Sequence, residues 1–141
     1  INRMMFDTKS KERVELEKMV LETADFLYDD RCLVLTVTSE MHSKSGCHPS
    51  DLDGVASISR SVEGVLIGVS IKQSEEDTYK ISLRTYEPFN ASEICKTLGG
   101  GGHKAAAGCT LTGSLSEVKK QIIDAVGKAI EENDTRAIVT E

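Results

Sequence analysis

The sequence predicts an α/β domain, with a mixed β-sheet of four to five strands that includes one hairpin and is flanked by helices. Two observations lead to this fold class. Apolar residues near both ends of the chain recur at three- and four-residue steps, which is typical of amphipathic helices. Short β-branched runs lie between them, and two of these runs are separated only by residues 73–77, a polar segment short enough for an antiparallel hairpin.

The first half of the chain is expected to form two helices and a buried strand. The first helix would span Ser10 to Asp29, with an apolar face made of Leu16, Met19, Val20, Thr23 and Leu27. The run Cys32–Thr38 is almost wholly apolar, which predicts a central strand covered on both faces. After the polar stretch 39–49, Ser50 would cap a helix that ends at Gly64 and turns inward Leu52, Val55, Ser59 and Val62.

The hairpin strands are expected at Val65–Lys72 and Thr78–Thr85. The second strand alternates clearly, so one face would carry Tyr79, Ile81, Leu83 and Thr85 and the other Lys80, Ser82 and Arg84.

The last third of the chain begins with a short helix, because Asn90 and Glu93 resemble a capping box and the helix would end at the glycine run after Leu98. A short strand is expected at Gly108–Thr112. Ser114 with Glu117 predicts the start of a final helix, whose inward residues would be Val118, Ile122, Ala125 and Ala129. The chain beyond Asn133 receives no assignment.

Composition limits the classes of function. Of the 141 residues 39% are hydrophobic and 28% charged, as in an ordinary globular protein, and no apolar run approaches the roughly 20 residues of a membrane-spanning helix. The net charge of −6 argues against a general binder of duplex DNA, so an anionic ligand would need a local pocket. The four cysteines are scattered singly, which suggests free thiols in a reducing cytoplasm.

The most unusual segment runs from Leu98 to Gly108 and contains four consecutive glycines followed by His103 and Lys104. Glycine is favoured where φ is positive or where the backbone approaches another group closely. Backbone N–H groups in such a loop can form a nest for phosphate, and a histidine and a lysine at its exit can add charged donors. The alternative is a flexible surface turn. The segment matches neither a nucleotide P-loop nor the Rossmann fingerprint, which requires a strand before the glycines.

Arg84 is a second candidate phosphate ligand, because it lies on the polar face of its strand with Ser82 beside it. The alternative is an ordinary solvated arginine. Two weaker signals involve metals. His42, Cys47 and His48 lack the fourth ligand of a zinc site, while Asp51 and Asp53 would bind a metal or favour a helix N-terminus.

These motifs together resemble a known family. The segments that carry the likeness are Ser82–Thr85, Leu98–His103, Ala106–Gly108, Asp51–Val55 and Arg60–Val65. They are similar, in residues and in spacing, to the DHH-associated C-terminal domain of subfamily one DHH phosphoesterases. The likeness is strongest to the bacterial oligoribonuclease (nanoRNase) and 3′-phosphoadenosine 5′-phosphate phosphatase group, which is related to RecJ and often labelled exopolyphosphatase-related. Thr85 and Leu98 replace the usual Ser and Phe.

The resemblance implies a role for each part of the chain. Residues 1–30 would form a connecting helix from an N-terminal DHH domain, residues 31–134 the substrate-binding domain, and residues 135–141 a tail. Substrate would be held by Arg84, Gly100, Gly101, Gly102 and His103, with Ser82 and Lys104 in support. No metal or other cofactor is expected in this chain. Mn²⁺ or another divalent metal would bind the DHH domain, because this chain has three histidines and no two of them are adjacent.

The expected function is therefore that of a nucleotide-binding half of a cytoplasmic, metal-dependent phosphoesterase acting on short RNA or 3′-phosphoadenosine 5′-phosphate. This chain alone would be inactive. Two alternatives stay open: a cyclic-dinucleotide phosphodiesterase, and a stand-alone nucleic-acid-binding module. The acidic balance and the absence of Trp disfavour the second alternative. The expected partners are the DHH domain and the nucleotide substrate, and no membrane; whether the protein forms a homodimer is left open.

Overall fold

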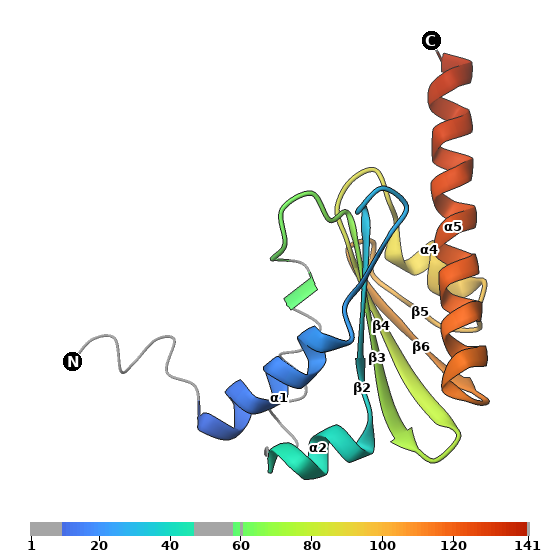
Figure 1. Ribbon diagram of the computed structural model, residues 1–141. Helices are drawn as coiled ribbons and strands as arrows, with labels where there is room; N and C mark the ends of the chain where they lie inside the picture. Colours follow the sequence, from blue (N-terminus) through green and yellow to red (C-terminus); the bar gives the residue numbers. More distant parts are fainter. Residues whose placement is uncertain (1–9, 47–57, 60, 141) are drawn as a thin grey trace.

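The fold is a six-stranded mixed sheet with helices on both faces (Figure 1). The computed structural model describes residues 10–46, 58–59 and 61–140, with side chains described as far as Arg136. Its elements, in order, are α1 (Lys11–Glu22), β1 (Asp25–Leu27), β2 (Cys32–Val37), α2 (Ser39–Ser45), β3 (Ile67–Glu75), β4 (Thr78–Thr85), α4 (Ala91–Lys96), β5 (Gly101–Gly102), β6 (Ala106–Thr112) and α5 (Leu115–Thr140).

The strands lie in the order β1-β2-β3-β4-β6-β5. Only the pair β2 and β3 is parallel, and every other neighbouring pair is antiparallel, so the predicted mixed α/β class with a hairpin is confirmed. The short edge strands β1 and β5 have no counterpart among the strands that the sequence located. All six residues of β2 are buried, as expected for a strand covered on both faces.

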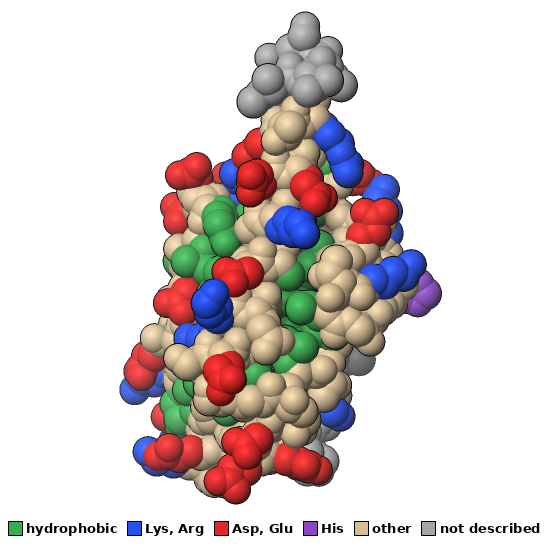
Figure 2. Space-filling model, turned by 90° about the vertical axis from the view of Figure 1, so that its right-hand side faces the viewer, with side chains coloured by type: hydrophobic (Ala, Val, Ile, Leu, Met, Phe, Trp, Pro, Cys, Tyr) green, Lys and Arg blue, Asp and Glu red, His purple; other side chains and the backbone are tan. Residues whose placement is uncertain are grey.

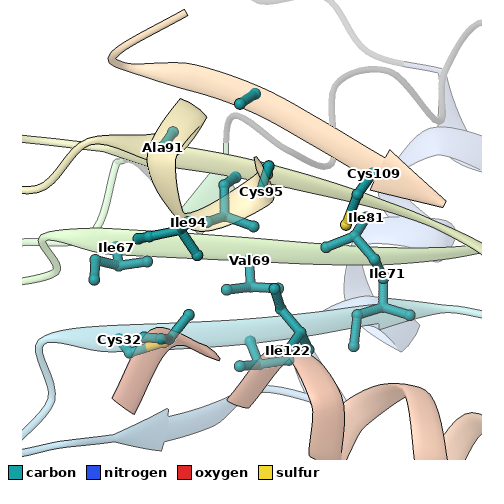
Figure 3. Close-up of a cluster of buried hydrophobic side chains, with 14 of the residues drawn as sticks. Cys32, Ile67, Val69, Ile71, Ile81, Ala91, Ile94, Cys95, Cys109 and Ile122 are labelled. Atoms are coloured by element: carbon teal, nitrogen blue, oxygen red, sulfur yellow. The ribbon is translucent and has the colours of Figure 1, made fainter. Parts of the chain in front are cut away.

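The larger core lies between the sheet and the pair α4 and α5. Strand residues such as Val69, Ile81 and Leu83 pack there against Ile94 and Ile122 (Figure 3). The smaller core lies on the opposite face, where Leu16 and Val20 of α1 cover Leu33, Leu35 and Val37 of β2. Figure 1 shows α1 and α2 on one side of the sheet and α4 and α5 on the other.

The predicted alternation of β4 is confirmed. Tyr79, Ile81, Leu83 and Thr85 are buried toward α4 and α5, whereas Lys80 is exposed and Ser82 and Arg84 are half-buried on the other face. The polar side chains of β4 therefore lie on the face of the sheet opposite α4 and α5.

The N-terminal helix is shorter than predicted, because it ends at Glu22 with Thr23 as its C-cap. The Thr23 hydroxyl donates to the Val20 carbonyl at 2.6 Å and accepts from the Thr36 N–H at 2.9 Å, which ties the chain to β2. Leu27, predicted on the helix, lies in β1 instead. The seven-residue α2, capped by the Thr38 hydroxyl, was not expected, and most of the helix predicted at 50–64 lies outside the described residues.

The final helix begins as predicted and is longer than predicted. The Glu117 N–H donates to the Ser114 hydroxyl, and the Ser114 N–H donates to the Glu117 carboxylate, each at 3.2 Å. Val118 and Ile122 are buried as expected, but the stripe continues through Val126 and Ile130, and Ala125 and Ala129 flank it. The helix continues to Thr140, so it includes most of the segment predicted as a tail.

Candidate functional site

A patch of small residues surrounds Ser82 and Arg84 on the face of the sheet opposite α4 and α5. The register places Arg84 beside Ala106 and Ser82 beside Gly108, and Gly101 of β5 pairs with Gly108 in turn. Directly paired residues of antiparallel strands turn to the same face. Ser82, Arg84, Ala106, Gly108 and Gly101 thus form one continuous surface, here called the platform. All five residues are half-buried.

The Arg84 guanidinium is available on this platform. It donates a hydrogen bond to the carbonyl of Leu83 at 3.3 Å. Within the described part of the chain, no carboxylate lies within ion-pair distance of it, whereas Arg31 lies 3.2 Å from Asp134. A guanidinium without a carboxylate partner retains the planar set of donors that fits phosphate.

The structural reasons for glycine differ from one position of the loop to the next. A Cβ atom on Gly100 would lie 2.2 Å from the Gly108 carbonyl oxygen and 2.5 Å from Cβ of Cys109, and one on Gly102 would lie 2.6 Å from Cα of Ala107. Gly102 also has a φ of 151°. Gly100 and Gly102 are therefore required for the close approach of β5 to β6.

Gly101 differs from both neighbours, because a Cβ atom there would meet no atom within 4 Å and its φ does not demand glycine. A side chain at Gly101 would stand on the platform beside Gly108, which separates it from Ser82 on β4. The packing of the described residues thus gives no reason for glycine at this position, whereas a ligand lying on the platform would.

The expected backbone nest does not form over most of the loop. The N–H groups of Gly99, Gly100 and His103 donate to the carbonyls of Lys96, Cys95 and Ala106 at 3.2, 2.9 and 2.8 Å. The first two bonds close the C-terminus of α4, and the third continues the pairing of β5 with β6, so these donors are satisfied within the chain. Any phosphate held here would depend on side chains more than the sequence suggested.

His103 lies at the end of β5, in the turn that leads to β6. Its N–H and carbonyl bond to the carbonyl and N–H of Ala106, which is the register partner of Arg84. The exposed His103 therefore belongs to the same end of the platform as Arg84. The next residue, Lys104, forms an exposed ion pair with Glu87 at 2.5 Å, so its ammonium group has a partner within the chain.

Thr85 fixes this turn, and sequence reasoning missed its role. The side chain is buried, and its hydroxyl lies 3.0 Å from the carbonyl oxygen of Lys104 and 3.2 Å from that of Phe89. The Thr85 N–H also donates to the carbonyl of Ala105 at 3.0 Å. The signal in the sequence is a polar residue at a core position of an alternating strand.

The other candidates of the sequence lie elsewhere or outside the described residues. Cys47, His48, Asp51 and Asp53 are not described, and His42 lies in α2. Among the residues that the structure describes, no group of three or more His, Cys, Asp or Glu side chains could hold a metal ion. Cys32, Cys95 and Cys109 are buried free thiols, and burial raises the pKa of Cys32 to about 12.

A second concave region lies on the far side of the sheet. It is a groove of about 380 Å³ between α4 and α5, with Phe89, Ile94 and Leu98 among its apolar residues. Figure 2 shows apolar side chains gathered along α5 within a charged surround. Arg84 and Ser82 point away from this groove. No helix in the described ranges is long and apolar enough to cross a membrane.

Comparison with known proteins identifies relatives. The model of the DHHA1 domain matches residues 29–132. The bifunctional oligoribonuclease and PAP phosphatase NrnA of Thermus thermophilus is 33% identical over 126 residues. That match covers 89% of this chain and 36% of the relative, so the chain spans about a third of the length of the curated relative.

Solved structures resemble the fold. An exopolyphosphatase-related protein from Bacteroides fragilis superimposes with a TM-score of 0.78 at 27% identity, over 89% of this chain and 37% of that chain. A pGpG-specific phosphodiesterase, PggH, from Vibrio cholerae has a TM-score of 0.51 at 14% identity, over 83% of this chain and 40% of that chain. The second likeness concerns the fold alone.

Proposed function

The chain belongs to the DHHA1 domain family, and from this premise we propose that it is the substrate-binding part of a phosphoesterase that hydrolyses short oligoribonucleotides, 3′-phosphoadenosine 5′-phosphate or both. The relative from Thermus thermophilus, named for these two activities, supports this substrate class. In the proposed arrangement a DHH domain outside this chain carries the hydrolytic site, and the platform holds the nucleotide against it.

The observation that carries the proposal is the open Gly101 on the same face as Arg84 and Ser82, across the small residues of β6. A flat surface without large side chains leaves space for a ligand, and the guanidinium at its end is not neutralised by any described carboxylate. Arg84 would bind a terminal phosphate through paired hydrogen bonds, and Ser82 would add a hydroxyl donor. His103 would complete the grip, because a phosphate neighbour favours the protonated histidine that donates from both ring nitrogens.

Catalysis would depend on this chain through positioning. A divalent metal such as Mn²⁺, when bound in the DHH domain, would supply an activated water and stabilise charge on the phosphoryl oxygens. The residues of the platform would hold the scissile phosphate in line with that water, and a misplacement of about 1 Å can reduce a rate roughly 100-fold. Gripping one terminal phosphate would also favour short substrates over long ones.

The test uses a protein in which this chain is joined to its DHH domain. Arg84→Ala and His103→Ala should each lower kcat/KM for a dinucleotide about 10- to 100-fold, as expected for the loss of a hydrogen bond to a charged group. Metal content should stay unchanged. Lys120→Ala, which removes a charge from α5 on the far side of the sheet, serves as the control. Wild-type kcat/KM in both platform variants would contradict the proposal.

A further inference from the structure

Two lysines lie on the same face of the sheet as Arg84, side by side on adjacent strands. The register pairs Lys72 of β3 with Lys80 of β4, Ser70 with Ser82, and Gly68 with Arg84. Because alternate residues of a strand share a face, Lys72 and Lys80 turn to the side that carries the platform. Thr110 of β6 is the other neighbour of Lys80. We call Lys72 and Lys80 the lysine pair.

Directly opposed like charges destabilise an antiparallel pair of strands, because their Cβ atoms are only about 5 Å apart. Within the described ranges no carboxylate lies within ion-pair distance of either lysine, although Lys104, Lys119 and Lys120 all have such partners. This arrangement occurs in a chain whose net charge is −6. An unneutralised cationic pair on an acidic protein is the arrangement that an anionic ligand would stabilise.

The β3 side of this face is covered, because Ser70 is buried and Gly68 lies against Ser59, so the path from the lysine pair to Arg84 runs along β4 and β6. Lys80 and Arg84 are four residues apart on one strand, which corresponds to about 13 Å. This separation leaves room for the lysine pair to contact a different phosphate of the same ligand from the one that Arg84 holds. Along that path lie small, half-buried residues, Ser82 of β4 and its register partner Gly108 of β6.

We propose that Lys72 and Lys80 form a second phosphate subsite, so that the platform binds a linear oligonucleotide along β4 rather than a single nucleotide. This inference rests on the proposed function and adds that linear oligonucleotides are preferred over mononucleotides. The end nucleotide is held at Arg84 and His103, and a phosphate further along the strand lies against the lysine pair. A mononucleotide reaches only the first subsite.

The test compares two ligands by calorimetric titration of this chain. The ligands are 3′-phosphoadenosine 5′-phosphate and a 5′-phosphorylated triadenylate. The variants are Lys72→Gln with Lys80→Gln, Arg84→Ala, and Lys120→Gln as a matched control that removes a charge from the far side of the sheet. Repetition at several salt concentrations gives the number of phosphates neutralised, because each contact to a single strand contributes about 0.7 to the salt slope.

The wild-type chain should bind the triadenylate more tightly, and the double lysine variant should lose about 5- to 10-fold of that affinity with a smaller salt slope. Its affinity for 3′-phosphoadenosine 5′-phosphate should stay the same, and Lys120→Gln should bind both ligands normally. Equal binding of the triadenylate by the double variant and the wild type would overturn the subsite. If Arg84→Ala still weakened both ligands, the proposed function would survive that result.

Thermal unfolding of the double lysine variant distinguishes ligand binding from a structural role. Relief of like-charge repulsion should leave its Tm at or above that of the wild type at low salt. A marked decrease in Tm, together with equal loss of affinity for both ligands, would mean that the lysines only support the fold, and would overturn the inference. Absence of binding of either ligand to the wild-type chain would overturn it together with the proposed function.

Discussion

Gly100 and Gly101 are adjacent in the sequence but have opposite surroundings. A methyl group on Gly100 would overlap the backbone of β6, whereas one on Gly101 would enter open space on the platform. Gly100→Ala should therefore lower the free energy of unfolding by about 1–3 kcal/mol, as for other overpacked sites. Gly101→Ala should leave it unchanged or raise it by up to about 1 kcal/mol, because the unfolded chain loses freedom. Urea unfolding measures both values.

Substitutions of Gly101 distinguish an effect on ligand binding from an effect on folding. Gly101→Leu should fold but bind nucleotide poorly, because its side chain would occupy the platform beside Gly108. Titration with 3′-phosphoadenosine 5′-phosphate measures this effect, with Gly101→Ala as the milder variant. If Gly101→Leu bound the nucleotide as well as the wild type does, the ligand could not lie across the platform.

Thr85 is the residue through which the His103 turn is fixed to the sheet. Thr85→Val keeps the shape of the side chain but leaves the carbonyls of Lys104 and Phe89 without their hydroxyl donor. It should lower the free energy of unfolding by about 1–3 kcal/mol. The hydroxyl acts on the ligand only by holding the turn that carries His103. Nucleotide affinity should therefore fall in Thr85→Val and stay at the wild-type level in Thr85→Ser, which keeps a hydroxyl. Equal affinity in all three proteins would contradict this positioning role.

At the scale of elements, α5 depends on its capping box. Hydrogen bonds from the Ser114 backbone and side chain lower the pKa of the Glu117 carboxyl. A lowered folded-state pKa contributes stability above the unfolded value, about 4.3 for Glu, that is lost as pH falls through the folded value. The wild type should therefore be more stable than Glu117→Gln at pH 7, and the difference should disappear in acid. Urea unfolding as a function of pH tests this, and a difference that persisted at low pH would contradict it.

Elements with a strong periodic pattern could be predicted from the sequence, and short elements could not. The alternation in β4 and the caps of α4 and α5 are local signals, and each is confirmed. The edge strands β1 and β5 have three and two residues and carry no pattern of their own. β1 forms because Thr23 ties the preceding chain to β2, and β5 forms because Gly100 allows a close approach to β6. The end of α1 was misplaced for the same reason.

At the scale of the whole molecule, one face of the sheet is covered by α4 and α5, whereas α1 packs on the other face over β2. Helices α4 and α5 bury the face with Val69 and Ile81, which leaves the polar alternates of β4 and β6 on the other face. The resemblance to a known family allowed Arg84 and the glycine loop to be predicted as one site. The relation of Arg84 to Lys72, and the difference between Gly101 and its neighbouring glycines, could not be predicted, because both depend on which residues pair across the strands.

The most direct test is an NMR titration of this chain with 3′-phosphoadenosine 5′-phosphate, following the ring signals of its three histidines. We expect saturable shifts of the His103 signals, smaller or no shifts of the His42 signals, and loss of the His103 response in Arg84→Ala. Unchanged His103 signals at millimolar ligand, or the same response in Arg84→Ala as in the wild type, would contradict a phosphate site shared by these two residues.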